Sequence, residues 1–543
     1  MNRNRTFNIA SIGFLPIVIA LASPVWAQER PASSLPLTLE DAVRRAVEHN
    51  PDLAIVRLGV DVEAARLSGT RGAFAPLFST ALGRTGTAAA PISTLLGTEP
   101  VTSGEWFSLT GVRQRLRRGG GTWSVNWEAS RTSTNDPLRS FDPALGSGLL
   151  LAFSQPLLRD RKIDTPRHDY EIAQRGQQTS ELRFRESVAQ TVAAVKLAYW
   201  TLKAAVANVT VQQRSLELAQ DLVRENRARV QIGQAPPVDL TQAEAEVATR
   251  RENLIRAETT AKDAEDHLRR LIMDPSDGDF WSVRLDPTAE PAGGPPPDVD
   301  RALAGALAGR YDLARARQDF ADADSNVALY TNQKMPDVRF EASYRGGGLG
   351  GSQLLRTGAF PGTIVGRADR GFADTIGQSF TNDFSNWSVG LTMSYPIGES
   401  YEKANLAKAQ VERQQVAYRI ESLRLQIVEA IRQAGRQVQS TSQRVDAARA
   451  GEALAEQRLQ DERRRFDAGL STTFLVTQAQ RDLLQAEVNL LQAMLDHQSS
   501  LVTFEAVQVA SPAAPGDAIG IRGSAIVAIP TQTPRGLFRS GGQ

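Results

Sequence analysis

Residues 416–445 read VAYRIESLRLQIVEAIRQAGRQVQSTSQRV and repeat apolar side chains at steps of mostly three or four residues. Steps of this size place the apolar side chains on one seam of an α-helix. A mean repeat of about 3.5 residues also favours helices that wind around one another. The pattern therefore predicts a helix over about residues 400–468. Its apolar positions are Val416, Ile420, Leu423, Ile427, Ile431, Ala434, Val438 and Val445.

A second stretch in the first half of the chain, residues 166–232, has the same pattern. Its apolar positions are Val188, Val192, Val195, Tyr199, Leu202, Val206, Val209, Leu216 and Val223. At about 1.5 Å per residue, each helix would be a rod of roughly 100 Å. That is about three times the apolar core of a bilayer, which is about 30 Å thick. Because their other faces are polar, we expect both rods to project into water. Thr165 and Pro166 are suited to the start of the first rod.

Composition excludes several classes of protein. The 543 residues include 62 Lys and Arg against 61 Asp and Glu, so no overall field recruits nucleic acid or anionic lipid. Cysteine is absent, which excludes disulfides, thiolate metal sites, cysteine nucleophiles and the acceptor of an N-terminal lipid anchor.

Residues 1–27 have the features of a signal peptide. Arg3 and Arg5 precede an apolar stretch, Phe7–Ala22, and Val25-Trp26-Ala27 ends in small residues that a signal peptidase reads. We expect cleavage after Ala27; a retained membrane anchor is the alternative. Since no later segment offers about 20 continuous apolar residues, the mature chain is either soluble outside the cytoplasm or crosses an outer membrane as strands.

The chain is a tandem duplication. A pair of short helices that ends at a proline occurs twice in the same register, once with Asp52-Leu53-Ala54 and Pro76 and once with Asp312-Leu313-Ala314 and Pro336. The turns that end the two rods also match. We therefore expect the first repeat over 28–273, a proline-rich linker over 274–297, the second repeat over 298–510 and a disordered tail over 511–543.

Each pair of short helices is followed by strand-like segments. Apolar and polar residues alternate strictly at 123–130, 338–344 and 387–395, and less clearly at 77–86, 105–115 and 147–155. Strands that are apolar on one face and polar on the other are typical of membrane barrels, although a soluble β-sandwich would show the same alternation. Residues 346–384 resemble a long outer loop. Residues 87–104 and 132–146 are similar in character and leave room for an additional hairpin.

No catalytic or cofactor site is indicated. The histidines at 49, 168, 267 and 497 lack the spacing of metal ligands, and no nucleophilic triad can be assembled. Gly119, Gly120 and Gly121 lie between two candidate strands, where a hairpin turn is favoured over a phosphate-binding loop. We expect neither enzymatic activity nor a cofactor.

Three stretches together carry a family resemblance. They are Pro36-Leu37-Thr38-Leu39-Glu40-Asp41-Ala42, Asn50-Pro51-Asp52-Leu53 and Arg465-Phe466-Asp467-Ala468-Gly469-Leu470-Ser471-Thr472. With the order of the elements, they resemble the TolC family of outer-membrane efflux proteins across nearly the whole mature chain. The fold class implied is mainly α with a transmembrane β part. Tandem long helical hairpins would form a periplasmic tunnel, and strands would be contributed to a trimeric outer-membrane β-barrel.

The resemblance also implies a function and partners. Family members are homotrimers in which each protomer gives about four strands to a shared barrel of twelve. They are passive exit ducts for efflux or secretion and work with an inner-membrane transporter and a periplasmic adaptor protein. Oligomerisation is also expected from the residues, because a few strands cannot close a barrel and open edges cannot face outer-membrane lipid. A non-channel periplasmic coiled-coil scaffold and an exported enzyme are the alternatives.

Candidate site residues follow from the resemblance. Adaptor docking at the helical tips is expected at Gly233, Phe466, Gly469 and Ser471. The entrance gate is expected at Asp239, Gln242, Leu475 and Gln478. Relatives often carry carboxylates at the gate positions of the second tip, whereas this chain has Leu475 and Gln478 there, so that Asp239 is the acid at the matched positions. An aromatic belt at the lipid interface is expected from Trp123, Trp127, Trp387 and Tyr395.

Overall fold

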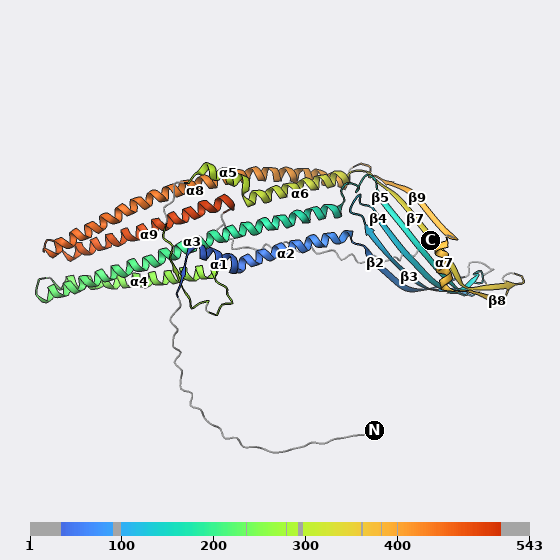
Figure 1. Cartoon of the computed structure of the whole chain (residues 1–543), viewed down its shortest axis with the longest axis horizontal. Helices are drawn as coiled ribbons and strands as arrows, with labels where there is room; N and C mark the ends of the chain where they lie inside the picture. The colour runs from blue at the N-terminus through green and yellow to red at the C-terminus, as the bar shows by residue number, and fades with distance from the viewer. Residues whose placement is uncertain are drawn as a thin grey trace, which may run out of the picture.

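The computed structural model is a long molecule with helices at one end and a sheet at the other (Figure 1). It describes residues 34–90, 99–234, 236–278, 280–291, 297–359, 362–381, 383–398 and 400–511. The predicted signal peptide lies outside these residues, as does the predicted tail apart from Ser511. Within the described residues, no helix combines the length and apolar character needed to cross a membrane.

The duplicated pairs of short helices form as predicted. In the first pair, the side chain of Asn50 accepts hydrogen bonds from the backbone N–H groups of Asp52 and Leu53, at 2.9 and 3.3 Å. Asn50 thereby ends one helix and caps the next. Arg310 lies at the same place in the second pair. The helices are α1 (Leu39–His49), α2 (Pro51–Arg71), α5 (Val299–Gly309) and α6 (Tyr311–Gln333).

Two long helical hairpins follow, one in each half, and the two rods have 67 residues each. Ser400 caps the second rod, as its side chain accepts from the backbone N–H of Lys403. Thr165 was predicted at the start of the first rod, but the N-cap residue is Asp164, one position earlier. The side chain of Asp164 accepts a hydrogen bond from the backbone N–H of Arg167 at 3.0 Å. The hairpins are α3 (Thr165–Gln231) with α4 (Pro237–Ile272) and α8 (Tyr401–Asp467) with α9 (Thr473–Val509).

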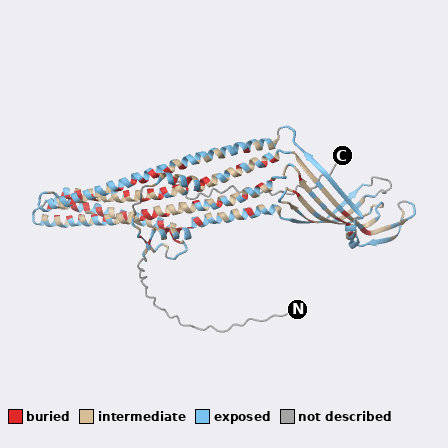
Figure 2. Ribbon diagram, turned by 45° about the horizontal axis from the view of Figure 1, so that its top comes forward, coloured by how far each residue is buried: buried red, intermediate tan, exposed pale blue. Residues whose placement is uncertain are grey.

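The predicted seams form the cores of the two halves. In the second half, Ile427 and Ile431 are fully buried and pack with Leu313 and Phe504. Full burial of such a side chain contributes about 1.5–3 kcal/mol. Buried residues lie where the helices face one another, and the outer faces are exposed (Figure 2). The helical rods are therefore held by packing along one face.

In the first half, the hydroxyl of Tyr199 joins the beginning of the chain to the segment between the repeats. It donates to the backbone oxygen of Leu37 at 2.9 Å and accepts from the N–H of Ala289 at 2.8 Å. Strand β1 (Ser34–Leu37) pairs in parallel with β6 (Arg284–Pro287) beside it. The proline-rich segment predicted as a linker therefore contains a strand that packs on α3.

Among the described residues, the main sheet is antiparallel and has seven strands. Neighbours follow the order β2, β3, β4, β5 and β7, while β9 pairs with the first part of β7 and β8 with its last part. The strands are β2 (Leu77–Ala89), β3 (Val101–Arg115), β4 (Thr122–Thr134), β5 (Phe141–Pro156), β7 (Asp337–Thr357), β8 (Thr363–Arg370) and β9 (Phe384–Ser394). The additional hairpin of the first half is present, so that the protomer exceeds the expected four strands.

The prediction of a long loop at 346–384 was wrong. Strand β7 continues to Thr357, and β8 and the helix α7 (Phe372–Thr381) follow it. A Cβ at Gly346 or Gly348 would collide with the backbone of α7 at Ser379 or Thr375. Glycine therefore lets the helix lie directly on the sheet, and its abundance here reflects close packing instead of a loop.

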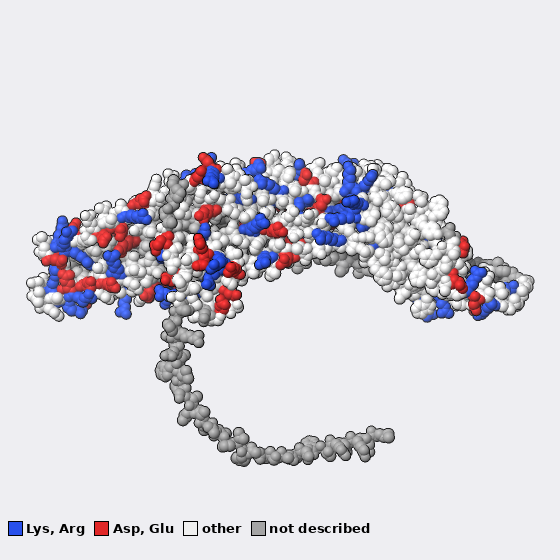
Figure 3. All heavy atoms as spheres, viewed as in Figure 1, with Lys and Arg blue, Asp and Glu red and all other residues white. Residues whose placement is uncertain are grey.

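The two faces of the sheet differ in polarity. Residues directly opposite on neighbouring strands share a face, and one such row runs Phe78, Val112, Val125, Leu151, Tyr344 and Trp387. The other face carries Asn126, Glu128 and Arg345. On the visible side of Figure 3, charged side chains cover the helical rods and the far end of the sheet, and the band between them is free of charge. This apolar band is typical of a surface in contact with lipid.

Candidate functional site

The two helical hairpins end in similar turns at the far end of the molecule (Figure 1). Gly233 and Gly469 have φ values of +75° and +71°, a conformation that strongly favours glycine. Behind Gly233, the N–H of Gln234 bonds to the oxygen of Arg229 at 2.8 Å. Behind Gly469, the N–H of Leu470 bonds to the oxygen of Arg465 at the same distance. These bonds satisfy carbonyls at each helix end, so the predicted glycine turns are present.

The second tip has no side-chain cap at the start of its returning helix. Thr472 occupies the N-cap position of α9, but its side chain makes no capping hydrogen bond. The hydroxyl of Ser471 instead donates to Glu462, back on α8. Ser471 therefore closes the turn against the outgoing helix and does not cap the returning one.

Phe466 has a different environment from the one expected of a docking residue. Its side chain is only 5% exposed and packs with Leu222 of α3 and Val476 of α9. The guanidinium of Arg229 lies 3.9 Å from the centre of the ring. In the protomer, Phe466 therefore joins the two hairpins and presents no surface to an adaptor.

Exposed apolar side chains at the tips were not predicted from the sequence. Leu470 is 80% exposed, and Phe474 is exposed one turn further along. Ile232 and Val238 are exposed beside the first turn. The sequence does hold one signal for them: they are apolar residues that lie near a turn glycine and outside the apolar seam of the helix. We call these four side chains and Leu475 the apolar tip residues.

The four predicted gate positions have unequal surroundings. Asp239 lies in the first turn of α4, and Gln242 is exposed one turn further along that helix. Leu475 is 45% exposed. Gln478 donates to Asp482 at 2.8 Å, and Arg458 of α8 contacts the other oxygen of that carboxylate at 2.8 Å. The second tip thus holds a carboxylate near the gate positions, although Arg458 balances its charge.

An ion pair joins the two hairpins above the tips. The guanidinium of Arg481 on α9 reaches Glu246 on α4, with one hydrogen bond of 3.3 Å and a shorter one. Arg250 contacts the same carboxylate at 2.6 Å. Burial would raise the pKa of Glu246, but the hydrogen bond from Arg481 and the charge of Arg250 outweigh it, so that the pKa is lowered.

The predicted belt residues lie on the sheet at different heights. Trp123 is next to the first residue of β4, and Tyr395 follows the last residue of β9, so both lie at the end nearest the helices. Trp387 is 71% exposed on the apolar face. Trp127 is partly covered, because its ring lies 6.2 Å from that of Phe372 on α7 and its N–H donates to Ser147 at 3.0 Å. Contact of all four with lipid stays a prediction.

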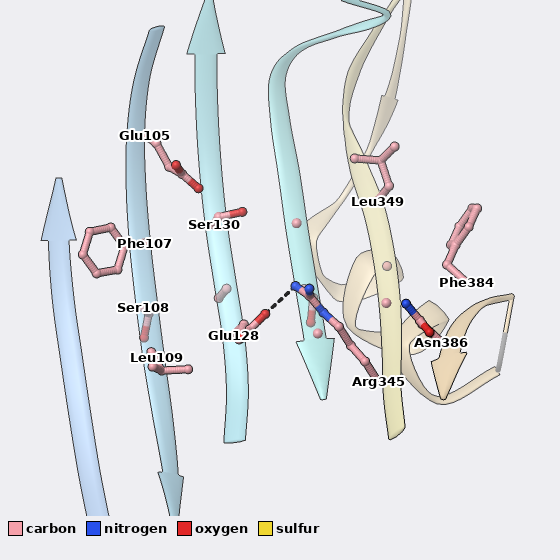
Figure 4. A pocket seen from close by; sticks show the side chains of 16 residues that line it. Glu105, Phe107, Ser108, Leu109, Glu128, Ser130, Arg345, Leu349, Phe384 and Asn386 are labelled. Carbon is pink, nitrogen blue, oxygen red and sulfur yellow. Dashed lines mark hydrogen bonds and ion pairs between the residues drawn. The ribbon is translucent and has the colours of Figure 1, made fainter. Parts of the chain in front are cut away.

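The polar face of the sheet contains a hollow of about 500 Å³ (Figure 4). Glu128 and Arg345 form an ion pair on its floor, and Glu105 and Asn386 lie on the same face. The hollow is also lined by the apolar side chains of Phe107, Leu109, Leu349 and Phe384. The polar side chains come from β3, β4, β7 and β9 and meet on one concave surface. Such a surface is what a water-filled lumen requires.

Comparison with known proteins assigns the family. A model of the outer membrane efflux protein family matches residues 124–272 and 302–507, which make up more than half of the chain. The chain belongs to the outer membrane efflux protein family. The predicted location in the outer membrane is confirmed, and so is the predicted combination of long helical hairpins with strands of a β-barrel.

A curated relative within the outer membrane efflux proteins is BepC of Brucella suis biovar 1 (strain 1330). It is 25% identical over 289 residues, or 53% of this chain and 56% of BepC. The match thus spans just over half the length of that relative.

Solved structures of outer membrane channels share the fold. The channel CmeC of Campylobacter jejuni has a TM-score of 0.60 at 15% identity, covering 88% of this chain and 87% of CmeC. The open state of MtrE from Neisseria gonorrhoeae has a TM-score of 0.58 at 18% identity, covering 87% of this chain and 89% of MtrE.

Proposed function

We propose that the protein is a passive exit duct for efflux, formed by three copies and working with a periplasmic adaptor and an inner-membrane transporter. The observation that carries the proposal is a sheet, apolar on one face and polar on the other, joined directly to two helical hairpins (Figure 1). Each part is incomplete alone, since the sheet has open edges and the polar hollow is open on one side. Repetition around an axis would enclose a continuous aqueous path through both parts.

The apolar tip residues support adaptor docking at the ends of the hairpins. Leu470 and Ile232 extend from turns whose backbone is fixed by Gly469 and Gly233. A rigid turn that presents exposed apolar side chains loses little entropy when a partner covers them. Docking would therefore use the turn and its flanking side chains, with Phe466 positioning them from behind.

We place the proposed entrance gate at the same end of the molecule. Asp239 would supply one carboxylate per protomer, or three around the axis of a trimer. Gln242, Leu475 and Gln478 would complete the constriction without adding charge. Repulsion among three unpaired carboxylates would favour bound cations at the entrance.

The substitution Gly469→Arg tests the docking surface. The arginine would strain the turn and place a charge beside Leu470, so we expect trimers in the outer membrane but loss of efflux in cells. The matched control is Gly451→Arg on α8, where the new side chain would meet open space and the helix tolerates arginine.

Three measurements separate the outcomes of this test. Heat-modifiable trimers on gels report assembly, single-channel currents in planar bilayers report a pore, and cross-linking in cells reports adaptor contact. Unchanged efflux in the Gly469→Arg variant would contradict docking at the tip. Release of the wild-type protein by osmotic shock would contradict the duct and support a periplasmic scaffold.

A further inference from the structure

The two outermost strands of the main sheet each lack a partner on one side in the part of the chain that the structure describes. β2 pairs with β3 alone and β9 with β7 alone. All eleven residues of β9 are exposed, as are all residues of β2 except Gly83. Unpaired N–H and C=O groups cannot face lipid, because no water replaces the missing hydrogen bonds there.

These two edges are complementary in direction. The six strands that begin or end beside the helices alternate in direction from β2 to β9. Because their number is even, β2 leaves the helical end and β9 returns to it. β9 of one copy can therefore lie antiparallel to β2 of the next, and the alternation continues without interruption.

The edges also match in polarity. Phe78 and Leu82 on β2 are 63% and 77% exposed, and they share the apolar face with Trp387 and Leu391 of β9. Pairing the edges would join these side chains into one continuous apolar surface. The same pairing would make the polar face continuous around the inside of the barrel.

Closure within a single copy is disfavoured by geometry. Five spacings of about 4.8 Å separate β2 from β9, which amounts to about 24 Å measured along the sheet. A barrel of eight strands is already filled by its own side chains, so one of six could not enclose the polar hollow.

The duplicated halves contain different numbers of these strands. Between α6 and α8, the strands that reach the helical end are β7 and β9. Between α2 and α3, there are four, β2 to β5. The first half of the chain thus has one hairpin more than the second half.

We propose that β9 of each protomer pairs with β2 of its neighbour and that three protomers close a barrel of eighteen strands instead of twelve. The proposal rests on the trimer of the proposed function. With strands tilted by about 40°, eighteen strands give a barrel about 36 Å across between strand axes, against about 24 Å for twelve. The additional hairpin would therefore widen the barrel, measured between strand axes, by about half.

The first test counts strands in the wild-type protein. Cryo-electron microscopy of the full chain in detergent or nanodiscs is expected to show a trimer with eighteen strands around a barrel about 36 Å across. A trimer with twelve strands would overturn this inference and leave the proposed duct intact. A dimer of two six-stranded sheets would overturn both, because it closes twelve strands without a third copy.

A second test uses the absence of cysteine from the sequence. Ser388 on β9 is changed to cysteine and combined in turn with cysteine at Ser79, Ala81 or Thr85, all exposed on the polar face of β2. A series is needed because the register between copies depends on the shear of the closed barrel. We expect one pair to give covalent trimers on non-reducing gels, since a disulfide requires Cα atoms within about 7 Å.

The matched control combines Ser388→Cys with Asn126→Cys. Asn126 lies on the same polar face but on the central strand β4, so no covalent trimer is expected. Failure of all three β2 positions to cross-link, in trimers that form normally, would overturn the pairing of β9 with β2. Cross-linking of the Asn126 control would do the same, because it would place β9 next to an inner strand.

Discussion

Glu246 of α4 and Arg481 of α9 form an ion pair that joins the two helical hairpins of one protomer. The carboxylate is almost fully buried, while the side chain of Arg481 is 54% exposed. Arg250, on the same helix, contacts the same carboxylate, so that two guanidinium groups share one acid. The pair lies close to the tips, about two turns from the start of each returning helix.

Replacement of this carboxylate should loosen the tips. In Glu246→Gln, Arg250 and Arg481 keep their charges without a balancing acid, and we expect a loss of about 2 kcal/mol in the free energy of unfolding. The value is below that of a fully buried pair because Arg481 is half exposed to solvent. Thermal unfolding followed by circular dichroism measures it. Glu252→Gln, in the exposed pair with Arg256, is the control and should change stability by less than about 0.5 kcal/mol.

Acid should weaken the same link. The pKa of Glu246 is lowered in the folded protein, so its contribution is complete above the unfolded value of about 4.3 and is lost as the pH falls through the folded value. We expect the stability difference between wild type and Glu246→Gln to be constant above about pH 6 and to shrink below about pH 4. A difference that does not shrink at all as the pH is lowered below about 4 would contradict a role for the charge.

Phe466 should support the tip by packing. Phe466→Ala removes a ring that contacts Leu222, Val476 and the guanidinium of Arg229, and we expect a loss of about 3 kcal/mol in the free energy of unfolding. Limited proteolysis should then cut the tips sooner. Phe474→Ala, in which the lost ring is 56% exposed, should leave stability nearly unchanged and weaken adaptor cross-linking. Equal loss of stability in both variants would contradict this division of roles.

Gly348 should be required for the seating of α7. In Gly348→Ala, the new methyl group would collide with the backbone of Thr375, so we expect α7 to leave the sheet. Faster amide hydrogen exchange across residues 372–381 would show this. Gly390→Ala on β9 is the control, because a Cβ there meets nothing within 4 Å. Unchanged exchange in the Gly348→Ala protein would show that the sheet can shift to accept the methyl group.

Asp239 should control cation passage if the gate lies at the first tip. We expect Asp239→Asn to reduce block of single-channel currents by divalent cations several-fold, because the three carboxylates of the trimer are removed together. Gln242→Glu adds a carboxylate one turn from Asp239 and should increase the block of the currents by divalent cations. Conductance and block equal to those of wild type in the Asp239→Asn channel would remove Asp239 from the gate.

Helices and strands with a strict period could be predicted from the sequence because their side chains repeat with the geometry of the backbone. Ile427, Ile431 and Val438 lie in the core where a seam of three and four residues placed them. The alternation at 123–130 likewise marked β4. These signals are local, because the spacing of apolar residues shows only which face of that helix or strand is apolar.

What could not be predicted depends on contacts between distant segments. The glycines around Gly348 resembled a loop because nothing local shows that α7 lies on them. Phe466 resembled a docking residue because its partner Arg229 belongs to the other repeat. The pairing of Glu246 with Arg481 was missed for the same reason.

The additional hairpin of the first half also bears on how such a protein can change. Both ends of the inserted segment must return to the same side of the membrane, so strands can be gained or lost only in pairs. A pair can be added between β2 and β5 without altering the helices or their tips. In the proposed duct, the width of the barrel and the fit of the tips to a partner are therefore separate features, and each can evolve while the other is held constant.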